Sequence, residues 1–292
     1  MFDTTAIIRL ASSLASAGLL VPVAPALAGP GNIELRVLVV TQTDGVLGPP
    51  QAPDRYVSLG LPIINEGGKV VFEAFVRRVG GSQRRGLFWA DENGSRTILI
   101  ENAFPLYDDV VTFGTLLRSV TTRERVVSQV ELSGPGVSTQ TNQAIVLYDF
   151  FRSTPLMRKG DAAPGFAVGS TITAFGDPLV NETGRVFISA RVRGPESSTD
   201  QFAVYECGDV PMHLLARSGV SGLGALDANG ISDSVSTIGV ARQGDVIVTQ
   251  SVRPPGANSR NSVVLRQRGD WAYLGRAGDA LRLRRDRPLR AG

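Results

Sequence analysis

Short apolar runs separated by polar turn residues fill most of the chain. Each run is rich in valine and isoleucine and is bounded by Gly, Pro, Asn or Asp, as in Lys69-Val70-Val71-Phe72. This is the pattern of β-strands joined by tight turns. Beyond the N-terminal segment, no stretch of ten or more residues shows the 3.6-residue periodicity of an amphipathic helix. The pattern therefore predicts an all-β protein.

The apolar runs recur at a nearly constant interval, which predicts internal repeats. Each copy opens with a hydrophobe-Gly step: Leu59-Gly60, Phe113-Gly114, Phe175-Gly176 and Ile238-Gly239. A valine then begins a strand, and the four valines Val70, Val126, Val186 and Val246 are 56, 60 and 60 residues apart. Later apolar residues, at Leu99, Met157, Leu215 and Leu274, are 58, 58 and 59 apart. We therefore expect four copies of a four-stranded unit, at residues 58–106, 111–165, 174–222 and 236–281.

Four-stranded units in tandem are typical of a β-propeller, where radial repetition protects the sheet edges. The alternative is a pair of stacked β-sandwiches. Hairpin ends are expected at Arg85-Gly86 and Asn93-Gly94, because glycine supplies the positive φ of tight turns. An extra strand is expected at residues 34–41, where the sequence is similar to the last strand of a unit.

Residues 1–28 have the pattern of a signal peptide. Arg9 precedes an apolar and small-residue stretch over residues 10–23, and Ala26-Leu27-Ala28 offers small residues for cleavage after Ala28. The alternative is an uncleaved membrane anchor, but the stretch is short for a span and contains Pro22. We therefore expect an exported protein, periplasmic or extracellular, with a mature β-repeat domain at 29–281 and no transmembrane segment after cleavage.

The net charge of +3 is concentrated at the C-terminus. The residues responsible are Arg282, Arg284, Arg285, Arg287 and Arg290, set against Asp286. They place +4 in residues 282–292, so the rest of the chain carries 3 − 4 = −1. The folded body is close to neutral, which argues against specific nucleic-acid binding. The tail is predicted to be disordered, with binding to an anionic surface as the alternative.

Two Asn-x-x-Gly turns precede strands, at Asn65 to Gly68 and at Asn181 to Gly184, and Gly160-Asp161 forms a third turn. These residues are expected to be structural, because Asn bonds the backbone two residues on and Gly accepts positive φ. The motifs that follow extend this pattern: Asn65-Glu66-Gly67-Gly68-Lys69-Val70-Val71-Phe72, Asn181-Glu182-Thr183-Gly184-Arg185-Val186-Phe187-Ile188, Gly160-Asp161-Ala162-Ala163-Pro164-Gly165 and Phe175-Gly176-Asp177-Pro178. Together they resemble the bacterial exported proteins with tandem NxxGxxxAF repeats. The resemblance covers about residues 58–280 and implies export and a repeated β fold, with no particular activity.

Candidate catalytic and metal-binding residues are few. His213 and Cys207 are the only residues of their types. Each lies in or at the end of an apolar strand, so we expect a packed thiol and no catalytic histidine. One His and one Cys cannot supply a usual zinc site. Residues 91–94, Asp-Glu-Asn-Gly, are expected to form a hairpin turn rather than a calcium loop. No catalytic, cofactor or metal site is predicted.

These observations favour a non-enzymatic binding module for a protein or glycan ligand. One alternative is a carbohydrate-active or lactone-type hydrolase with a central pair of carboxylates, for which the candidates are Asp177, Glu182, Asp227 and Asp233. Another is a cell-envelope-associated protein tethered by its arginine-rich tail.

Overall fold

The computed structural model describes most of the chain after residue 53 and two short segments before it. The described segments are 19–23, 34–39, 54–64, 69–77, 80–91, 93–101, 105–107, 111–122, 125–149, 152–195, 199–208, 211–223, 229–240, 246–267 and 270–276. They contain strands, turns and loops and no helix, which confirms the all-β prediction. A helix long and apolar enough to cross a bilayer is accordingly not found within them.

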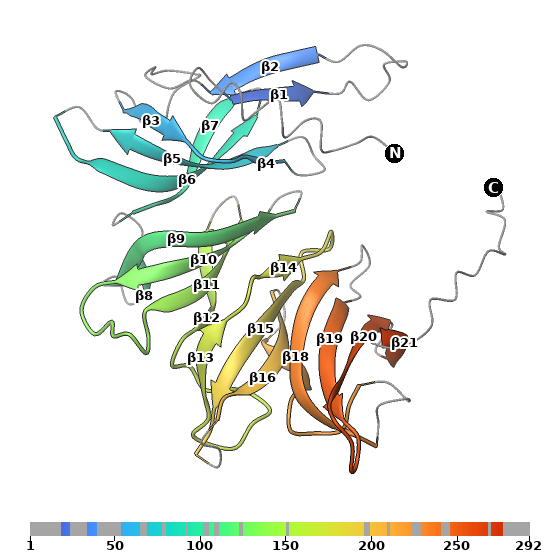
Figure 1. Ribbon diagram of the computed structural model, residues 1–292. Helices are drawn as coiled ribbons and strands as arrows, with labels where there is room; N and C mark the ends of the chain where they lie inside the picture. Colours follow the sequence, from blue (N-terminus) through green and yellow to red (C-terminus); the bar gives the residue numbers. More distant parts are fainter. Residues whose placement is uncertain are drawn as a thin grey trace, which may run out of the picture.

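Four antiparallel sheets follow one another along the chain around an arc (Figure 1). Sheet I contains β3 (Arg55–Leu59), β4 (Ile63–Ile64), β5 (Val70–Arg77), β6 (Gln83–Asp91) and β7 (Gly94–Ile100). Sheet II contains β8 (Pro105–Tyr107), β9 (Val111–Thr121), β10 (Arg125–Ser133), β11 (Gln143–Asp149) and β12 (Arg152–Arg158). Sheet III contains β13 (Thr171–Phe175), β14 (Leu179–Val180), β15 (Val186–Arg193), β16 (Gln201–Cys207) and β17 (His213–Arg217). Sheet IV contains β18 (Ile231–Val240), β19 (Val246–Arg253), β20 (Arg260–Gln267) and β21 (Asp270–Arg276).

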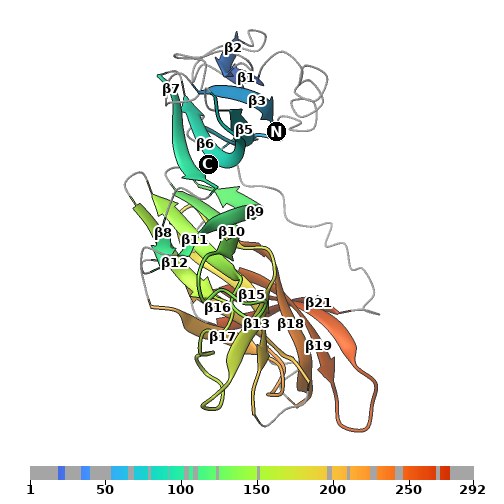
Figure 2. The same cartoon turned by 90° about the vertical axis from the view of Figure 1, so that its left-hand side faces the viewer.

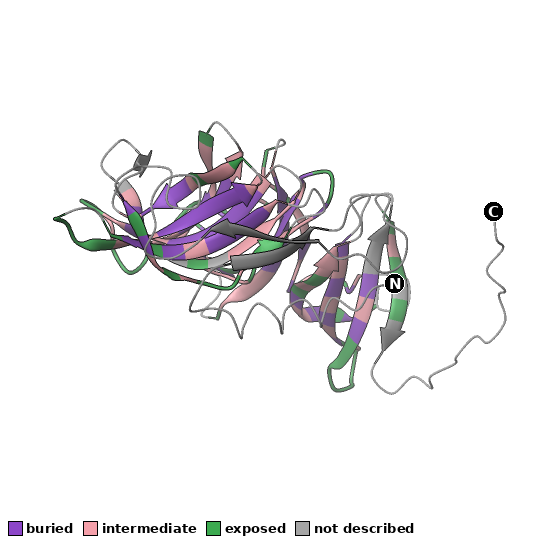
Figure 3. Cartoon of the chain, turned by 90° about the horizontal axis from the view of Figure 1, so that it is seen from above, coloured by how far each residue is buried: buried purple, intermediate pink, exposed green. Residues whose placement is uncertain are grey.

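Within each sheet the strands pair in chain order, and the short strands β4 and β14 pair with β5 and β15. Neighbouring sheets pack face to face, so that the apolar faces form three seams. One cluster joins sheets I and II, a second joins II and III, and a third joins III and IV. Viewed from above, the buried residues run along the strands and the exposed ones gather at the turns (Figure 3). Four successive antiparallel sheets, three of five strands and one of four, stacked in this way make a propeller-like architecture.

The four repeat valines occupy equivalent positions, as predicted. Val70, Val126, Val186 and Val246 are all 0% exposed and lie at or next to the start of the second long strand of their sheets. Each of them pairs with the last residues of the preceding inner strand. Val126, Val186 and Val246 face the preceding sheet, and Val70 lies in the outer cluster of sheet I. β-Branched residues suit this position because the side chain packs on a covered pleated surface. Repetition in the sequence thus corresponds to repetition in the packing.

The face of sheet I that points away from sheet II has its own apolar cluster. Tyr56, Phe72 and Phe88 pack there with ring centroids 5.1 to 5.8 Å apart. An N-terminal hairpin of β1 (Leu19–Val23) and β2 (Glu34–Val39) lies beyond this face, and β2 contacts β6 and β7 (Figures 1 and 2). The strand expected at residues 34–41 is therefore paired with a segment of the predicted signal peptide.

Three sequence-based expectations differ from the structure. Arg85-Gly86 is not a hairpin end, because both residues lie inside β6, opposite Phe75 and Ala74. Gly86 is needed there for space, since a Cβ would lie 2.8 Å from the Phe88 ring. The sheets also begin earlier than the expected repeats, and residues 105–106, assigned to the first repeat, belong to β8 of sheet II. Leu274 is 53% exposed at an irregularity in β21, unlike the buried Leu99 and Met157.

The first long strand of every sheet is broken or bulged along its length. In sheets I and III the break falls at the predicted hydrophobe-Gly step, where the Gly60 N–H donates to Glu73 O (2.7 Å) and the Gly176 N–H donates to Ser189 O (2.8 Å). In sheets II and IV the same strand is continuous but bulged. Bulges redirect side chains at sheet edges and near binding sites. These inner strands adjoin one another across the arc, since β4 contacts β9, and β14 contacts both β9 and β18.

Candidate functional site

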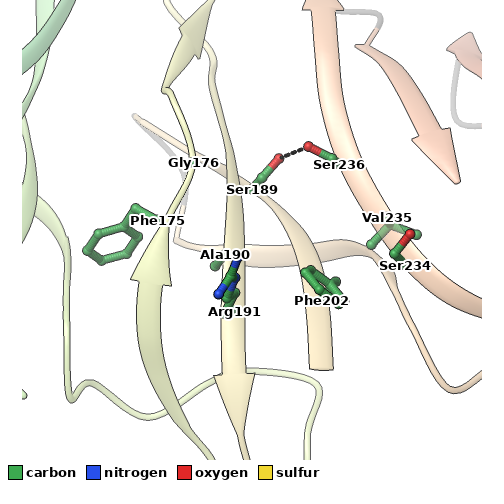
Figure 4. Close-up of a pocket in the computed structure, with 9 residues that line it drawn as sticks. All are labelled: Phe175, Gly176, Ser189, Ala190, Arg191, Phe202, Ser234, Val235 and Ser236. Carbon is green, nitrogen blue, oxygen red and sulfur yellow. Dashed lines mark hydrogen bonds between the residues drawn. The ribbon is translucent and has the colours of Figure 1, made fainter. Parts of the chain in front are cut away.

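A pocket of about 380 Å³ opens at the seam between sheets III and IV. Its lining comes from β13, β15, β16 and β18 and from the break after β13 (Figure 4). The lining residues are Phe175, Gly176, Ser189, Ala190, Arg191, Phe202, Ser234, Val235 and Ser236. Pockets of roughly 300–1,000 Å³ that combine apolar walls with a few polar groups are typical sites for small molecules.

The apolar part of the pocket comes mainly from Val235 and Phe202. Val235 is buried, at 2% exposed, and packs with the half-buried Phe202 ring in the cluster between sheets III and IV. Phe175 and Ala190 pair across β13 and β15 and pack in the cluster between sheets II and III, so their side chains face away from Arg191 and Phe202. Gly176 keeps this corner open, because a Cβ at that position would lie 3.2 Å from Ser189 Cβ. The hydrophobe-Gly step thus shapes one wall of the pocket.

Hydroxyl groups hold the two sheets together beside the pocket. Ser189 Oγ lies 2.9 Å from Thr237 Oγ1 and 3.2 Å from Ser236 Oγ, and it accepts a 2.8 Å hydrogen bond from the Thr237 N–H. This network crosses from β15 to β18 (Figure 4). Because Ser189 and Ser236 contact each other in this network, the Ser234 hydroxyl is the one better placed to meet a ligand.

Arg191 is the charged group of the pocket. Its guanidinium lies 5.9 Å from the centre of the Phe202 ring, directly across the β15–β16 pairing. Within the described residues it has no ion pair, whereas Arg193 on the same strand pairs with Asp200 at 2.7 Å. Arg185, at the start of the strand, pairs with Glu206. The pocket therefore carries a positive charge that no described carboxylate neutralises.

His213 is the first residue of β17 and is 47% exposed in its side chain. Its Nε2 lies 3.4 Å from the carboxylate of Glu206, whose side chain is only 2% exposed. Arg185 donates to the other oxygen of the same carboxylate. Buried charges are tolerated when they are paired in this way. The neighbouring thiol, Cys207, is buried, and burial together with the negative charge of Glu206 raises its pKa to about 12.

The predicted turn residues of sheet III are well defined. The Asn181 carboxamide oxygen accepts hydrogen bonds from the Thr183 N–H (3.1 Å), the Thr183 hydroxyl (2.8 Å) and the Arg185 N–H (2.9 Å). Gly184 has φ +82° and closes this turn. Gly160 has φ +90°, and the Asp161 carboxylate accepts from the Arg158 N–H at 2.7 Å. Partial burial raises the pKa of Asp161. Asn65 and Gly68 lie outside the described residues, as do Asp227 and the arginine tail.

The candidate carboxylates of a hydrolase do not line the pocket. Asp177 follows Gly176 and is exposed, and Glu182 is exposed in the turn before β15. Asp233 accepts hydrogen bonds from Ser259 and Arg253, which lower its pKa. Among the described residues, no group of three or more His, Cys, Asp or Glu side chains is placed to hold a metal ion. The Asn93-Gly94 turn joins β6 to β7, with the Asn93 N–H bonded to Asp91 at 2.8 Å.

Comparison with protein families places the chain in a defined group. One family model matches residues 31–288, nearly the whole chain after the predicted signal peptide. The chain belongs to the family of unknown function DUF7453. The resemblance to the tandem NxxGxxxAF proteins and a bacterial origin stay predictions, because the DUF7453 match tests neither. No curated protein matches the chain in sequence.

Two solved structures share a distant likeness with this DUF7453 protein. The first is a subtype N11 neuraminidase-like protein of A/flat-faced bat/Peru/033/2010 (H18N11), with a TM-score of 0.31 and 12% identity over 82% of this chain and 68% of that one. The second is the α-L-arabinofuranosidase Arb93A from Fusarium graminearum, with a TM-score of 0.27 and 10% identity over 79% of this chain and 81% of that one.

Proposed function

We propose that this chain is an exported, non-enzymatic binding module whose ligand site is the pocket between sheets III and IV. The observation that carries the proposal is the composition of the lining. The Phe202 ring, the buried Val235 side chain, serine hydroxyls and the Arg191 guanidinium, which no described carboxylate neutralises, lie together there. Such a combination binds and orients a small molecule or one group of a larger one. Placement at a seam between two rigid sheets also keeps the site preorganised.

The lining favours binding over glycoside hydrolysis. A glycosidase of the usual kind needs two carboxylates about 5–9 Å apart across the scissile bond. The pocket residues include no Asp, Glu or His. Of the four candidate acids, Asp233 is engaged with Arg253 and Ser259, and Asp177 and Glu182 lie in exposed segments.

Export is supported by the sequence of residues 1–28 alone. Cleavage after Ala28 would remove β1 and leave β2 with an unpaired edge. Mass spectrometry of the N-terminus of protein secreted with its own leader tests this part. A mature N-terminus at Gly29 is expected, and an intact residue 1 in the exported fraction would contradict it.

Binding is tested by screening the purified full chain against a library of small neutral and charged fragments with ligand-observed NMR. We expect ligands whose affinity falls at least about tenfold in Phe202→Ala. The substitution removes the ring on which a ligand can stack and against which the Arg191 guanidinium lies. Phe75→Ala is the control, since Phe75 is a phenylalanine at the corresponding strand pair of sheet I and lies outside the pocket. Ligands whose affinity is unchanged in Phe202→Ala would contradict a binding site in this pocket. New product signals in the spectra would contradict a non-enzymatic function.

A further inference from the structure

We infer that the pocket takes an organic anion whose carboxylate pairs with Arg191 while its apolar body lies against Phe202. This inference rests on the proposed function and names its ligand class. Three observations carry it: a comparison between two sheets of the chain, the charge of the lining, and the apolar floor.

Sheets I and III contain the same cross-strand pair in opposite orientation. In sheet I, Phe75 of β5 lies opposite Arg85 of β6. In sheet III, Arg191 of β15 lies opposite Phe202 of β16. Phe75 and Arg191 are both five residues after their repeat valine (75 − 70 and 191 − 186). Each pair therefore places one guanidinium and one phenyl ring at the same place on its sheet.

The two sheets differ in what stands three residues after the repeat valine. In sheet I this residue is Glu73 (73 − 70), which accepts from Arg85 Nη2 at 2.5 Å and from Nε at 3.0 Å. In sheet III it is Ser189 (189 − 186), which has no charge. The carboxylate that neutralises the arginine in sheet I is thus missing in sheet III. A ligand carboxylate bound at Arg191 would restore the interaction that Glu73 makes.

The remaining lining fits the same ligand class. Arg191 is the one charged residue among those that line the pocket. Phe202 lies against its guanidinium, which reduces the entropy cost of holding it for a ligand. A guanidinium recognises carboxylates through two parallel N–H bonds, so a cation is repelled and a neutral ligand leaves the charge without a partner. Ser234 adds a hydroxyl group on the opposite wall.

The apolar floor requires that the anion carry an apolar body. Val235 is buried at the base, and the Phe202 ring contributes aromatic surface on the same side of sheet III. A volume of about 380 Å³ accommodates a ring with its substituents and not a bare inorganic ion alone. A ring or short chain bearing a carboxylate satisfies both the floor and Arg191.

Benzoate is a suitable first probe, because it combines a ring with a carboxylate. Its neutral isostere benzamide and the ring-free anion acetate are the comparison ligands. Each is titrated into the purified full chain and followed by ligand-observed NMR. A fragment of this size is expected to bind with a Kd of about 1 mM. Benzamide and acetate are expected to bind at least about tenfold more weakly, since each lacks one half of the interaction.

Two substitutions separate the specific pair from general charge. Arg191→Gln is expected to abolish the preference for benzoate over benzamide without unfolding the protein, because within the described residues the Arg191 side chain makes no ion pair. Arg193→Gln removes the same charge two residues along the strand, from an arginine that already pairs with Asp200, and should leave benzoate affinity within about twofold. Ser189→Glu installs the sheet I carboxylate and should weaken benzoate binding as Arg191→Gln does, with thermal unfolding used to confirm the fold.

The outcomes distinguish this inference from the proposed function. Equal binding of benzamide and benzoate would overturn the anion assignment and leave a neutral-ligand site standing. Equal losses in Arg191→Gln and Arg193→Gln would show attraction by net charge only, and would also overturn it. Failure of all three probes to bind would overturn the anion site, while the fragment screen with Phe202→Ala decides separately whether the pocket binds anything.

Discussion

Replacing Asn181 with alanine removes the acceptor that organises the turn before β15. Its carboxamide oxygen accepts three hydrogen bonds, two of them from the backbone N–H groups of Thr183 and Arg185. The residue is 3% exposed, so water cannot simply take its place. Thr183 is exposed and its hydroxyl regains solvent, which leaves two backbone donors to lose their partner. At about 1–2 kcal/mol for each unsatisfied donor, Asn181→Ala should lower the free energy of unfolding by about 2–4 kcal/mol.

Urea unfolding followed by tryptophan fluorescence measures this change, since Trp89 and Trp271 report on sheets I and IV. Asn93→Ala is the matched control, because Asn93 is exposed in a hairpin turn and uses its backbone N–H for its bond to Asp91. It should cost less than about 0.5 kcal/mol. Asn181→Asp keeps the acceptor and should lie between the two. A loss for Asn181→Ala no larger than for Asn93→Ala would refute the argument that the side chain holds this turn.

Two further predictions concern the core and a strained loop. With its pKa at about 12, the Cys207 thiol should react with a thiol reagent at pH 8 only as fast as the protein unfolds. The folded state keeps this thiol neutral while the unfolded state ionises near pH 9, so Cys207 contributes stability that is present below pH 9 and lost as pH rises toward 12. The dependence is at most about 1.4 kcal/mol per pH unit and should be reduced in Cys207→Ala; an unchanged slope would contradict it. Gly165→Ala forces a Cβ to 2.4 Å from Leu214 at φ +81°, whereas Gly256→Ala has φ +70° and no atom within 4 Å. Both pay backbone strain of about 1–2 kcal/mol, and only Gly165→Ala should lower the melting temperature further; equal shifts would refute a steric role for Leu214.

The fold was accessible from sequence because its signal is local and repeated. β-Branched runs mark the strands, and the regular spacing of Val70, Val126, Val186 and Val246 marks equivalent sheets, all four being fully buried. The prediction of a hairpin end at Arg85-Gly86 was wrong, and the reason is also local. A polar run ending in glycine is typical of a turn, but the glycine is required by the Phe88 ring within the strand. A strand segment whose arginines face solvent has the same polarity as a turn, so polarity alone does not distinguish the two.

The pocket was not accessible in the same way, because it depends on register and on packing between sheets. Ser189 and Ser236 are 47 residues apart in the chain and meet only across the seam. The pairing of Arg191 with Phe202 depends on the hairpin register. One signal was nonetheless present in the sequence. When the first and third repeats are aligned, the Phe75–Arg85 pair of the first corresponds to the Arg191–Phe202 pair of the third, with the two residue types exchanged. In the same alignment, Ser189 takes the position of the acidic residue Glu73.

The position of the pocket at a boundary between two units links occupancy to unfolding. Each sheet buries its apolar faces mainly against its neighbours, so the array resembles a row of units held by nearest-neighbour contacts. Sheet IV is the last unit and packs against sheet III alone among the described sheets. A molecule bound by both β15 and β18 stabilises the interface between sheets III and IV. It adds RT ln(1 + [L]/Kd) to the free energy needed to separate sheet IV from sheet III. Amide exchange in β19 and β20 would then slow on saturation while exchange in sheet I stays constant, so the response to a ligand would be confined to one end of the molecule.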